Sequence, residues 1–214
     1  MKKIGYSLLA CTAFIGTSAF AMTAPSLYFT LGAGYAEQQA MPGADEFANI
    51  SNVTAGTATS SSTQEMGGRV GIGIDWTTGK YTSAGVELAA ALYGSSTYDQ
   101  DNASLELNYY GTELLGVGRL HLGKMALIGK AGVVNESVHP SKSNFGATGG
   151  ENIQDDSEVL PEVGAGLGYQ VGKHTQLSAM YYHTFGHDVS FDTQSSATNS
   201  PSINVIDLEI GYYY

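Results

Sequence analysis

The chain has 214 residues, with 9 Lys or Arg against 20 Asp or Glu, so its formal net charge is −11. Such acidity argues against a nucleic-acid partner, because neutralising phosphates needs clustered basic side chains, and a hydrophobic content of 43% argues against disorder. Glycine, with 28 residues, is about twice as frequent as usual, and there are 14 tyrosines. These features favour a β-rich fold.

The first 21 residues have the three parts of a secretory signal peptide. Lys2 and Lys3 give a positive start, 4–15 is apolar, and Ala19 and Ala21 form a small-x-small cleavage site. Cleavage after Ala21 leaves residues 22–214 without a cysteine and with a net charge of −13, because it also removes two lysines. We therefore predict an exported protein that has no disulfide.

The alternative for this segment is a lipoprotein signal processed at Cys11. That signal would shorten the apolar stretch to 4–9, below the roughly 7–15 residues such stretches contain. Beyond residue 21, no apolar run reaches the roughly 18 residues that a membrane-spanning helix requires.

Three short segments share one turn design: 77–80, 122–124 and 171–174 each carry a Gly-Lys pair between runs of alternating apolar residues. Glycine supplies the backbone freedom that a tight hairpin turn requires. The glycines lie 44 and 49 residues apart, which matches two strands and one long loop. The segments therefore predict three β-hairpins.

Four longer polar stretches alternate with these turns, at 37–63, 95–102, 137–157 and 186–202. Three turns and four loops divide the mature chain into eight strands. Short connections on one side and long ones on the other are typical of outer-membrane barrels.

Apolar residues alternate with small, polar or charged residues in seven of the predicted strands. In the first, Leu27, Phe29, Leu31 and Ala33 share one face. The pattern of every second residue apolar predicts strands with one apolar face.

The fourth strand breaks this pattern. Leu107 and Tyr109 lie at odd positions, whereas Leu114 and Leu120 lie at even positions. A β-bulge near 110–112 would reconcile the two halves.

A soluble sandwich or a lipocalin-like barrel would show the same alternation. Three features favour a membrane barrel instead: many glycines on the non-apolar face, aromatic residues at strand ends, and charges of both signs on the non-apolar face. We therefore predict an all-β fold, an eight-stranded antiparallel up-and-down transmembrane β-barrel.

The segment 206–214 is apolar at every second position and ends on an aromatic residue. It is similar to the signal that the barrel-assembly machinery recognises. Its residues are Ile206, Leu208, Ile210, Tyr212 and Tyr214. With strand-like segments such as 163–169, it makes the chain resemble the eight-stranded outer-membrane barrels of the OmpA/OmpX kind over 22–214. Because the sequence stops at Tyr214, we expect no peptidoglycan-binding domain.

The interior of so narrow a barrel is filled by side chains. We predict that the charged residues of the non-apolar face form a lumen network, with Glu106 as a further candidate. Its members are Glu65, Arg69, Asp75, Glu87, Lys130, Glu136, Glu162, Asp207 and Glu209. Arg69 and Lys130 should each engage carboxylates, because unpaired buried charges are unfavourable. The network is either purely structural or a gated cation path.

Catalysis, a cofactor and a metal site are not expected. The one dense histidine region, around His183 and His187, offers Thr184 where a nucleophilic serine would be required. On a strand, the two histidines would lie about 13 Å apart.

These observations predict a structural and surface-interaction protein of the cell outer membrane whose acidic extracellular loops present a binding surface. Expected partners are outer-membrane lipid, lipopolysaccharide bridged by divalent cations, the barrel-assembly machinery and an extracellular or host protein. The alternative is a narrow channel for ions or small solutes, porin-like or similar to the OmpW barrels.

Overall fold

The computed structural model describes residues 24–39, 60–62, 64–100, 103–145, 156–187 and 200–214. The predicted signal peptide, with Ala19 and Ala21, lies outside the described residues, as do large parts of the predicted loops. The strands in the described ranges are β1 (Ser26–Gln39), β2 (Ser60–Ser62), β3 (Gln64–Thr77), β4 (Thr82–Gln100), β5 (Ala103–Leu122), β6 (Met125–Phe145), β7 (Asp156–Gln170), β8 (Thr175–Thr184) and β9 (Ser202–Tyr213).

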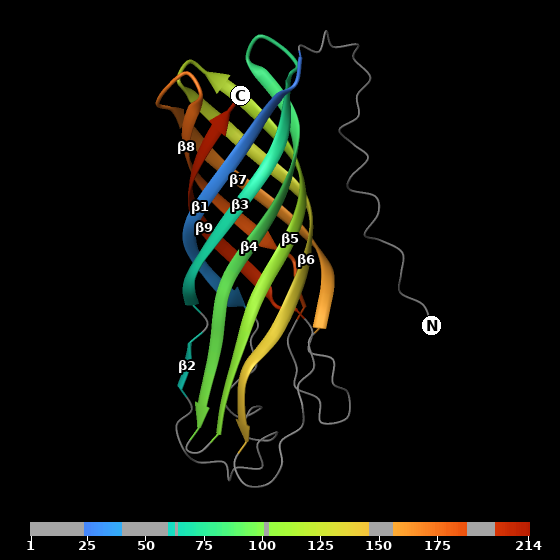
Figure 1. Cartoon of the computed structure of the whole chain (residues 1–214), viewed down its shortest axis with the longest axis vertical. Coiled ribbons are helices and arrows are strands. Elements are labelled where there is room, and N and C mark those ends of the chain that lie inside the picture. The colour runs from blue at the N-terminus through green and yellow to red at the C-terminus, as the bar shows by residue number, and fades with distance from the viewer. Residues whose placement is uncertain (1–23, 40–59, 63, 101–102, 146–155, 188–199) are drawn as a thin grey trace, which may run out of the picture.

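Eight of these strands close into an antiparallel barrel, because β1 pairs with both β3 and β9 (Figure 1). The ninth, β2, is a three-residue strand that pairs only with β4. This arrangement confirms the predicted fold. The part of the chain that the structure describes contains no helix long and apolar enough to cross a membrane.

The strands are staggered by ten residues around the barrel. One row of paired residues runs through Tyr213, Tyr28, Gly73, Glu87, Leu115, Gly132, Glu162, Thr184 and Ile203. The row starts on β9 at Tyr213 and returns to β9 at Ile203, 213 − 203 = 10 residues away. Such a stagger is expected to tilt the strands by roughly 40° against the barrel axis. Figure 1 shows the strands inclined to that axis.

The three predicted hairpin turns are present and lie at one end of the barrel, which we call the turn end. They connect β3 to β4, β5 to β6 and β7 to β8. Gly123 adopts a φ of +69°, a conformation that favours glycine. The opposite end, where the longer connections lie, is called the loop end.

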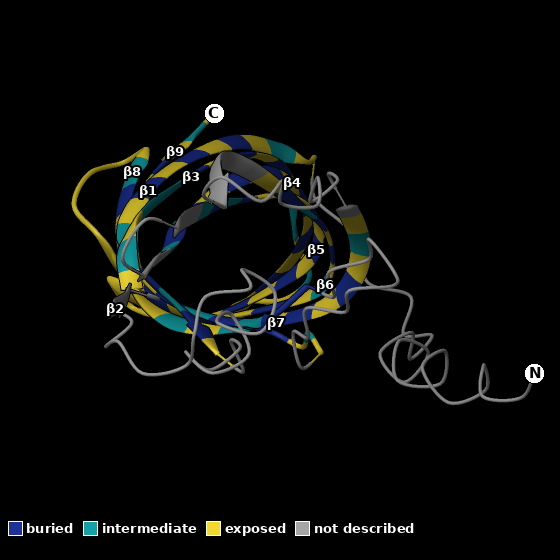
Figure 2. Cartoon of the chain, turned by 90° about the horizontal axis from the view of Figure 1, so that it is seen from below, coloured by how far each residue is buried: buried dark blue, intermediate teal, exposed yellow. Residues whose placement is uncertain are grey.

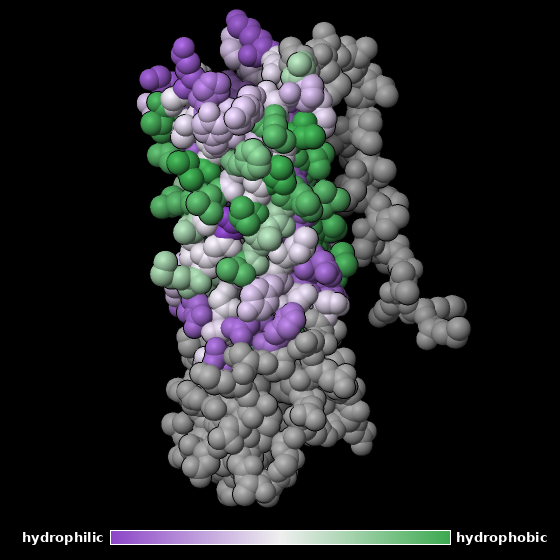
Figure 3. Space-filling model, in the orientation of Figure 1, coloured by the Kyte–Doolittle hydropathy of each residue, from purple (hydrophilic) through white to green (hydrophobic). Residues whose placement is uncertain are grey.

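The outer surface of the barrel carries the apolar residues. Along β1, β8 and β9, exposed apolar positions alternate with buried ones (Figure 2). On the face in Figure 3, these side chains form a hydrophobic belt across the barrel, bounded above and below by hydrophilic residues. The apolar strand faces predicted from alternation therefore point outward. An outward-facing belt of this kind matches the hydrocarbon layer of a bilayer rather than water.

In the interior, or lumen, three of the buried tyrosines each pack against a glycine of a neighbouring strand. The pairs are Tyr28 with Gly73, Tyr93 with Gly111 and Tyr182 with Gly164. A Cβ atom added to Gly73 would lie 2.3 Å from Cζ of Tyr28. At these three positions the ring occupies volume that a side chain on the adjacent wall would need.

The fourth barrel strand, β5, differs from its prediction. It alternates without a break from Leu107 to Leu120, so the expected bulge at 110–112 is wrong. Leu107 and Tyr109 point into the lumen with the other odd-numbered residues. The apolar character of these positions reflects packing inside the barrel rather than contact with lipid.

Two register shifts occur elsewhere. One lies between Glu106 and Leu107 on the β5–β6 side, and the other between Leu92 and Ser95 of β4. The second contains Gly94 with a φ of +79°, a conformation that bulges commonly place on glycine.

Strands β4, β5 and β6 continue well past the other strands at the loop end (Figure 1). The polar stretches predicted as loops at 95–102 and 137–157 are in large part strand, since β4 reaches Gln100 and β6 reaches Phe145. These extensions, with β2, build a wall on one side of the loop end.

We expect the substitution Gly73→Ala to destabilise the barrel by about 1–3 kcal/mol, because the new methyl group overlaps the Tyr28 ring. The matched control is Gly118→Ala, which faces outward and would meet no atom within 4 Å. The measurement is the urea midpoint in detergent micelles, followed by fluorescence of Trp76, the single tryptophan. Equal midpoints for the two variants would contradict the packing argument.

Candidate functional site

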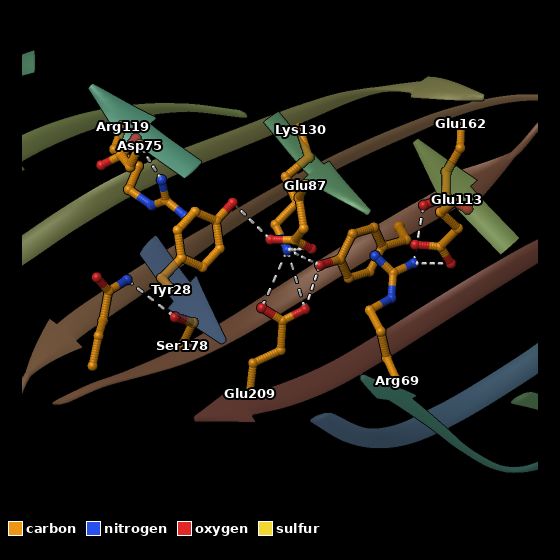
Figure 4. A network of polar contacts seen from close by, with 12 residues as sticks. Tyr28, Arg69, Asp75, Glu87, Glu113, Arg119, Lys130, Glu162, Ser178 and Glu209 are labelled. Carbon is orange, nitrogen blue, oxygen red and sulfur yellow. Dashed lines mark hydrogen bonds and ion pairs between the residues drawn. The ribbon is translucent and has the colours of Figure 1, made fainter. Parts of the chain in front are cut away.

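Among the residues that the structure describes, three cations lie inside the lumen, each on a different strand. Arg69 (β3), Arg119 (β5) and Lys130 (β6) are each 4% exposed. Figure 4 shows that carboxylates from several strands converge on them. Each cation organises one cluster, and the three clusters are described in turn.

The Arg69 cluster joins three strands that are not neighbours. Nη2 of Arg69 lies 2.7 Å from Oε1 of Glu113 on β5 and 2.9 Å from Oε1 of Glu162 on β7. Tyr93 donates a hydrogen bond to each carboxylate, at 2.8 Å and 3.3 Å. Thr184 donates another to Glu162 at 3.2 Å. Both carboxylates are thereby paired and hydrogen-bonded, as buried charges require.

The Lys130 cluster connects β6 across the lumen to β4 and β9. Nζ of Lys130 lies 2.8 Å from Oε1 of Glu87 on β4 and 3.4 Å from Oε2 of Glu209 on β9. It also donates to the Tyr182 hydroxyl at 2.8 Å, and that hydroxyl donates to Glu209. The ammonium thus uses all three of its donors.

The Arg119 cluster lies toward the turn end. Nη1 of Arg119 is 2.9 Å from Oδ1 of Asp75. Its guanidinium carbon lies 4.7 Å from the ring centroid of Tyr28 and 5.6 Å from that of Tyr213, and these two rings stack on each other. The cation is therefore held by both an ion pair and aromatic faces.

Two tyrosines join the clusters into one network. The Tyr28 hydroxyl donates to Glu87 at 3.0 Å, which links the Arg119 and Lys130 clusters. The Arg69 guanidinium carbon lies 3.5 Å from the ring centroid of Tyr182, which connects the Lys130 and Arg69 clusters. Polar contacts therefore extend along the lumen from Asp75 to Glu162.

All nine residues expected in the lumen network lie on the inner face of their strands. Glu65 and Asp75 are half-buried and the other seven are buried. Glu65 accepts a hydrogen bond from the Ser95 backbone at 2.9 Å. Among the described residues, Glu65, Glu136 and Asp207 form no ion pair, so ion pairs connect only six of the nine.

Sequence reasoning missed two members, Glu113 and Arg119, which both lie on β5. The reason is the uncertain register of that strand. Both residues have odd numbers, which places them on the strand face opposite the even-numbered, apolar Leu114 and Leu120. This alternation was the available signal.

The histidine region forms separate contacts at the loop end. His183 lies 2.7 Å from the side-chain oxygen of Asn204 and packs edge-on against Phe185. His187 lies 3.4 Å from Glu158. Across the described ranges, no group of three or more His, Cys, Asp or Glu side chains is arranged to hold a metal ion.

A serine–histidine pair lies at the turn end. Oγ of Ser83 is 3.2 Å from Nε2 of His121, and the sequence separation of 38 residues concealed it. The two groups have the chemistry of a nucleophile and a base. Within the described residues, however, no third side chain orients the second ring nitrogen of His121, and the His121 backbone N–H is bound to the carbonyl oxygen of Tyr81.

No protein-family model and no curated protein sequence matches the chain. Its fold is shared with solved outer-membrane barrels. Neisserial surface protein A is 12% identical with a TM-score of 0.50, over 90% of this chain and 100% of that one. Ail of Yersinia pestis is 12% identical with a TM-score of 0.46, over 87% and 98%. The outer-membrane enzyme PagL is 12% identical with a TM-score of 0.42, over 86% and 98%.

The class that the barrel defines is therefore the eight-stranded outer-membrane β-barrel, the fold of the OmpA/OmpX kind that the sequence resembles. At these identities the likeness establishes the fold alone, and the chemistry of the lumen must be argued from this chain's own residues.

Neutralising Arg69 with Arg69→Met leaves Glu113 and Glu162 buried without their cation, and we expect a loss of about 3–5 kcal/mol. The triple variant that adds Glu113→Gln and Glu162→Gln should recover most of that loss. The control is Lys124→Met in an exposed turn. Urea midpoints in micelles measure the effect, and a triple variant no more stable than the single one would refute the ion-pair account.

Proposed function

We propose that this protein is an integral outer-membrane barrel that is closed to transport and without catalysis, and that it holds its loop end at the cell surface for interaction. One observation carries the proposal: Arg69 and Lys130 bind carboxylates from strands across the lumen, so side chains cross the path that a solute would take. A water-filled channel would need a wider polar interior.

An apolar layer next to the Arg69 cluster supports a closed lumen. Val134 pairs across strands with Glu113, and Leu160 pairs with Val134. Both side chains are buried, as are those of Leu107 and Ile203 on other strands. Apolar side chains inside a barrel exclude water from the space that they fill.

The loop end supports the surface-interaction role. The long β4, β5 and β6 extend past the hydrophobic belt, and the connections around them are rich in acidic residues. Loops on a rigid scaffold are where binding functions concentrate. The partners we propose are outer-membrane lipid, lipopolysaccharide bridged by divalent cations, and an extracellular or host protein that tolerates an acidic surface.

The second candidate function is a narrow channel for cations. The observation in its favour is the excess of carboxylates over the three lumen cations, including Asp207, one of whose oxygens has no partner among the described residues. Rings of acidic side chains favour cations over anions.

Planar-bilayer recording distinguishes these two functions. We expect the purified protein to give no discrete conductance steps, and Arg69→Ala to give none either, because the remaining side chains still fill the lumen. Reproducible steps in the unmodified protein would establish the channel instead. Steps that arise only in Arg69→Ala would identify Arg69 as a charge gate.

We also propose that residues 1–21 are a signal peptide cleaved after Ala21, and that the C-terminal strand is read by the barrel-assembly machinery. Ile206, Leu208, Ile210, Tyr212 and Tyr214 all face outward. Tyr214 is 79% exposed, and its backbone N–H donates to the carbonyl oxygen of Leu27 on β1. The terminal residue thus has little packing role inside the barrel.

Deleting Tyr214 should reduce the amount of heat-modifiable barrel in the outer membrane severalfold, because the new terminal residue, Tyr213, packs on the lumen side against Tyr28 and the outward-facing terminal aromatic group is lost from the signal. The control Tyr214→Phe keeps an aromatic terminus and should assemble normally. Gel mobility of heated and unheated membranes measures assembly. Normal assembly of the deletion variant would remove the support for this signal.

A further inference from the structure

Two carboxylates face each other across strands β6 and β7. Glu136 and Glu158 are directly paired residues in the register of these strands. Opposed like charges destabilise a sheet when nothing neutralises them. The pair lies toward the loop end, beyond the level at which β6 pairs with Glu162.

Glu136 is the more unusual member of the pair. Its side chain is 0% exposed, and neither carboxylate oxygen has a hydrogen-bond partner within the described part of the chain. The charges of Glu158 and Glu162 both act on it. A buried carboxylate without hydrogen bonds and with two like charges nearby is stable only if a proton neutralises it or a positive charge compensates it.

The lumen cations do not supply that charge. Arg69, in the cluster described above, already forms ion pairs with Glu113 and Glu162. Lys130 is bound by Glu87 and Glu209. The third cation, Arg119, pairs with Asp75 toward the turn end.

We propose that a divalent cation of the Ca²⁺ class binds between Glu136 and Glu158 at the loop end of the lumen. Two carboxylates supply up to four oxygen ligands, and water supplies the remainder of the six to eight that Ca²⁺ takes. Ca²⁺ accepts irregular oxygen geometry, whereas Mg²⁺ requires a near-ideal octahedron.

The surroundings of Glu158 provide access for the ion. The side chain of Glu158 is 36% exposed, whereas that of Glu136 is fully buried. Oε1 of Glu158 lies 3.4 Å from Nδ1 of the exposed His187. An ion from outside the cell therefore meets Glu158 first and Glu136 behind it. This inference concerns the mouth of the barrel and does not depend on whether the lumen conducts.

Tb³⁺, which replaces Ca²⁺ at oxygen sites, is the probe for the first experiment. Tyr93 packs on Gly111, and Gly111 is paired with Glu136, so tyrosine excitation should sensitise bound Tb³⁺. We expect saturable luminescence from the full-length mature barrel in micelles, displaced by Ca²⁺ at roughly 10⁻⁴–10⁻³ M. The substitution Glu136→Gln should weaken the binding by about tenfold or more.

The matched control is Glu37→Gln. Glu37 is another half-buried acidic residue near the loop end, but it already accepts a hydrogen bond from Gln64 at 3.0 Å. This variant should bind Tb³⁺ as the unmodified protein does. If Glu136→Gln does not fold, Glu158→Gln provides the same comparison. Equal Tb³⁺ affinity of the tested variant and the unmodified protein would place the ion elsewhere and overturn the proposal.

Stability gives the second readout. Ca²⁺ should raise the unfolding temperature of the unmodified protein and leave that of Glu136→Gln unchanged. With a chelator present, Glu136→Gln should be at least as stable as the unmodified protein, because the like-charge repulsion is removed. No response of the unmodified protein to Ca²⁺ would show that protons neutralise the pair, which would also overturn the proposal.

Discussion

The constraint on which the structure depends is the width of a closed barrel of eight strands. A stagger of ten residues determines the strand tilt, and the resulting interior holds side chains and little else. Each inward residue must therefore match its neighbours in size. The contact between Tyr28 and Gly73 shows the consequence, because the ring occupies the volume that any side chain at Gly73 would need.

The same narrowness brings charges from distant strands into contact. Arg69 meets Glu162 although 93 residues separate them in sequence. These contacts also protect the register of the sheet. A slip of β3 by one residue would move Arg69 from the lumen into the hydrocarbon layer, which is strongly unfavourable. The network thus contributes specificity of pairing, beyond any contribution to stability.

The sequence was sufficient for the outer face of the barrel and much less informative about the inner face. Lipid requires an apolar side chain at every second position, so strands such as β9 were recognisable from alternation alone. The lumen makes no comparable demand, because it accepts both charges and apolar groups. Leu107 and Tyr109 were therefore misassigned on β5, and Glu113 and Arg119 were overlooked there.

Strand ends and cross-lumen partners were beyond sequence reasoning for different reasons. Past the bilayer, neither face of a strand requires apolar residues, so the polar ends of β4 and β6 resembled loops. Which acid meets which base depends on the stagger around the whole barrel, and no local pattern contains that information. The Ser83 and His121 contact was hidden for the same reason.

The cations at the centre of the lumen are paired, whereas Glu136 near its loop end has no partner among the described residues, and the two regions have different roles. The three cations are paired within a connected network whose carboxylates extend from Asp75 to Glu162. The uncompensated Glu136 lies beyond that network, at the end where the strands lengthen and the connections become acidic. A centre of paired charges makes the barrel rigid, whereas the Glu136 carboxylate at the mouth, which has no partner among the described residues, is suited to respond to ions outside. A change in external cation concentration would then alter the loop end without disturbing the barrel that supports it.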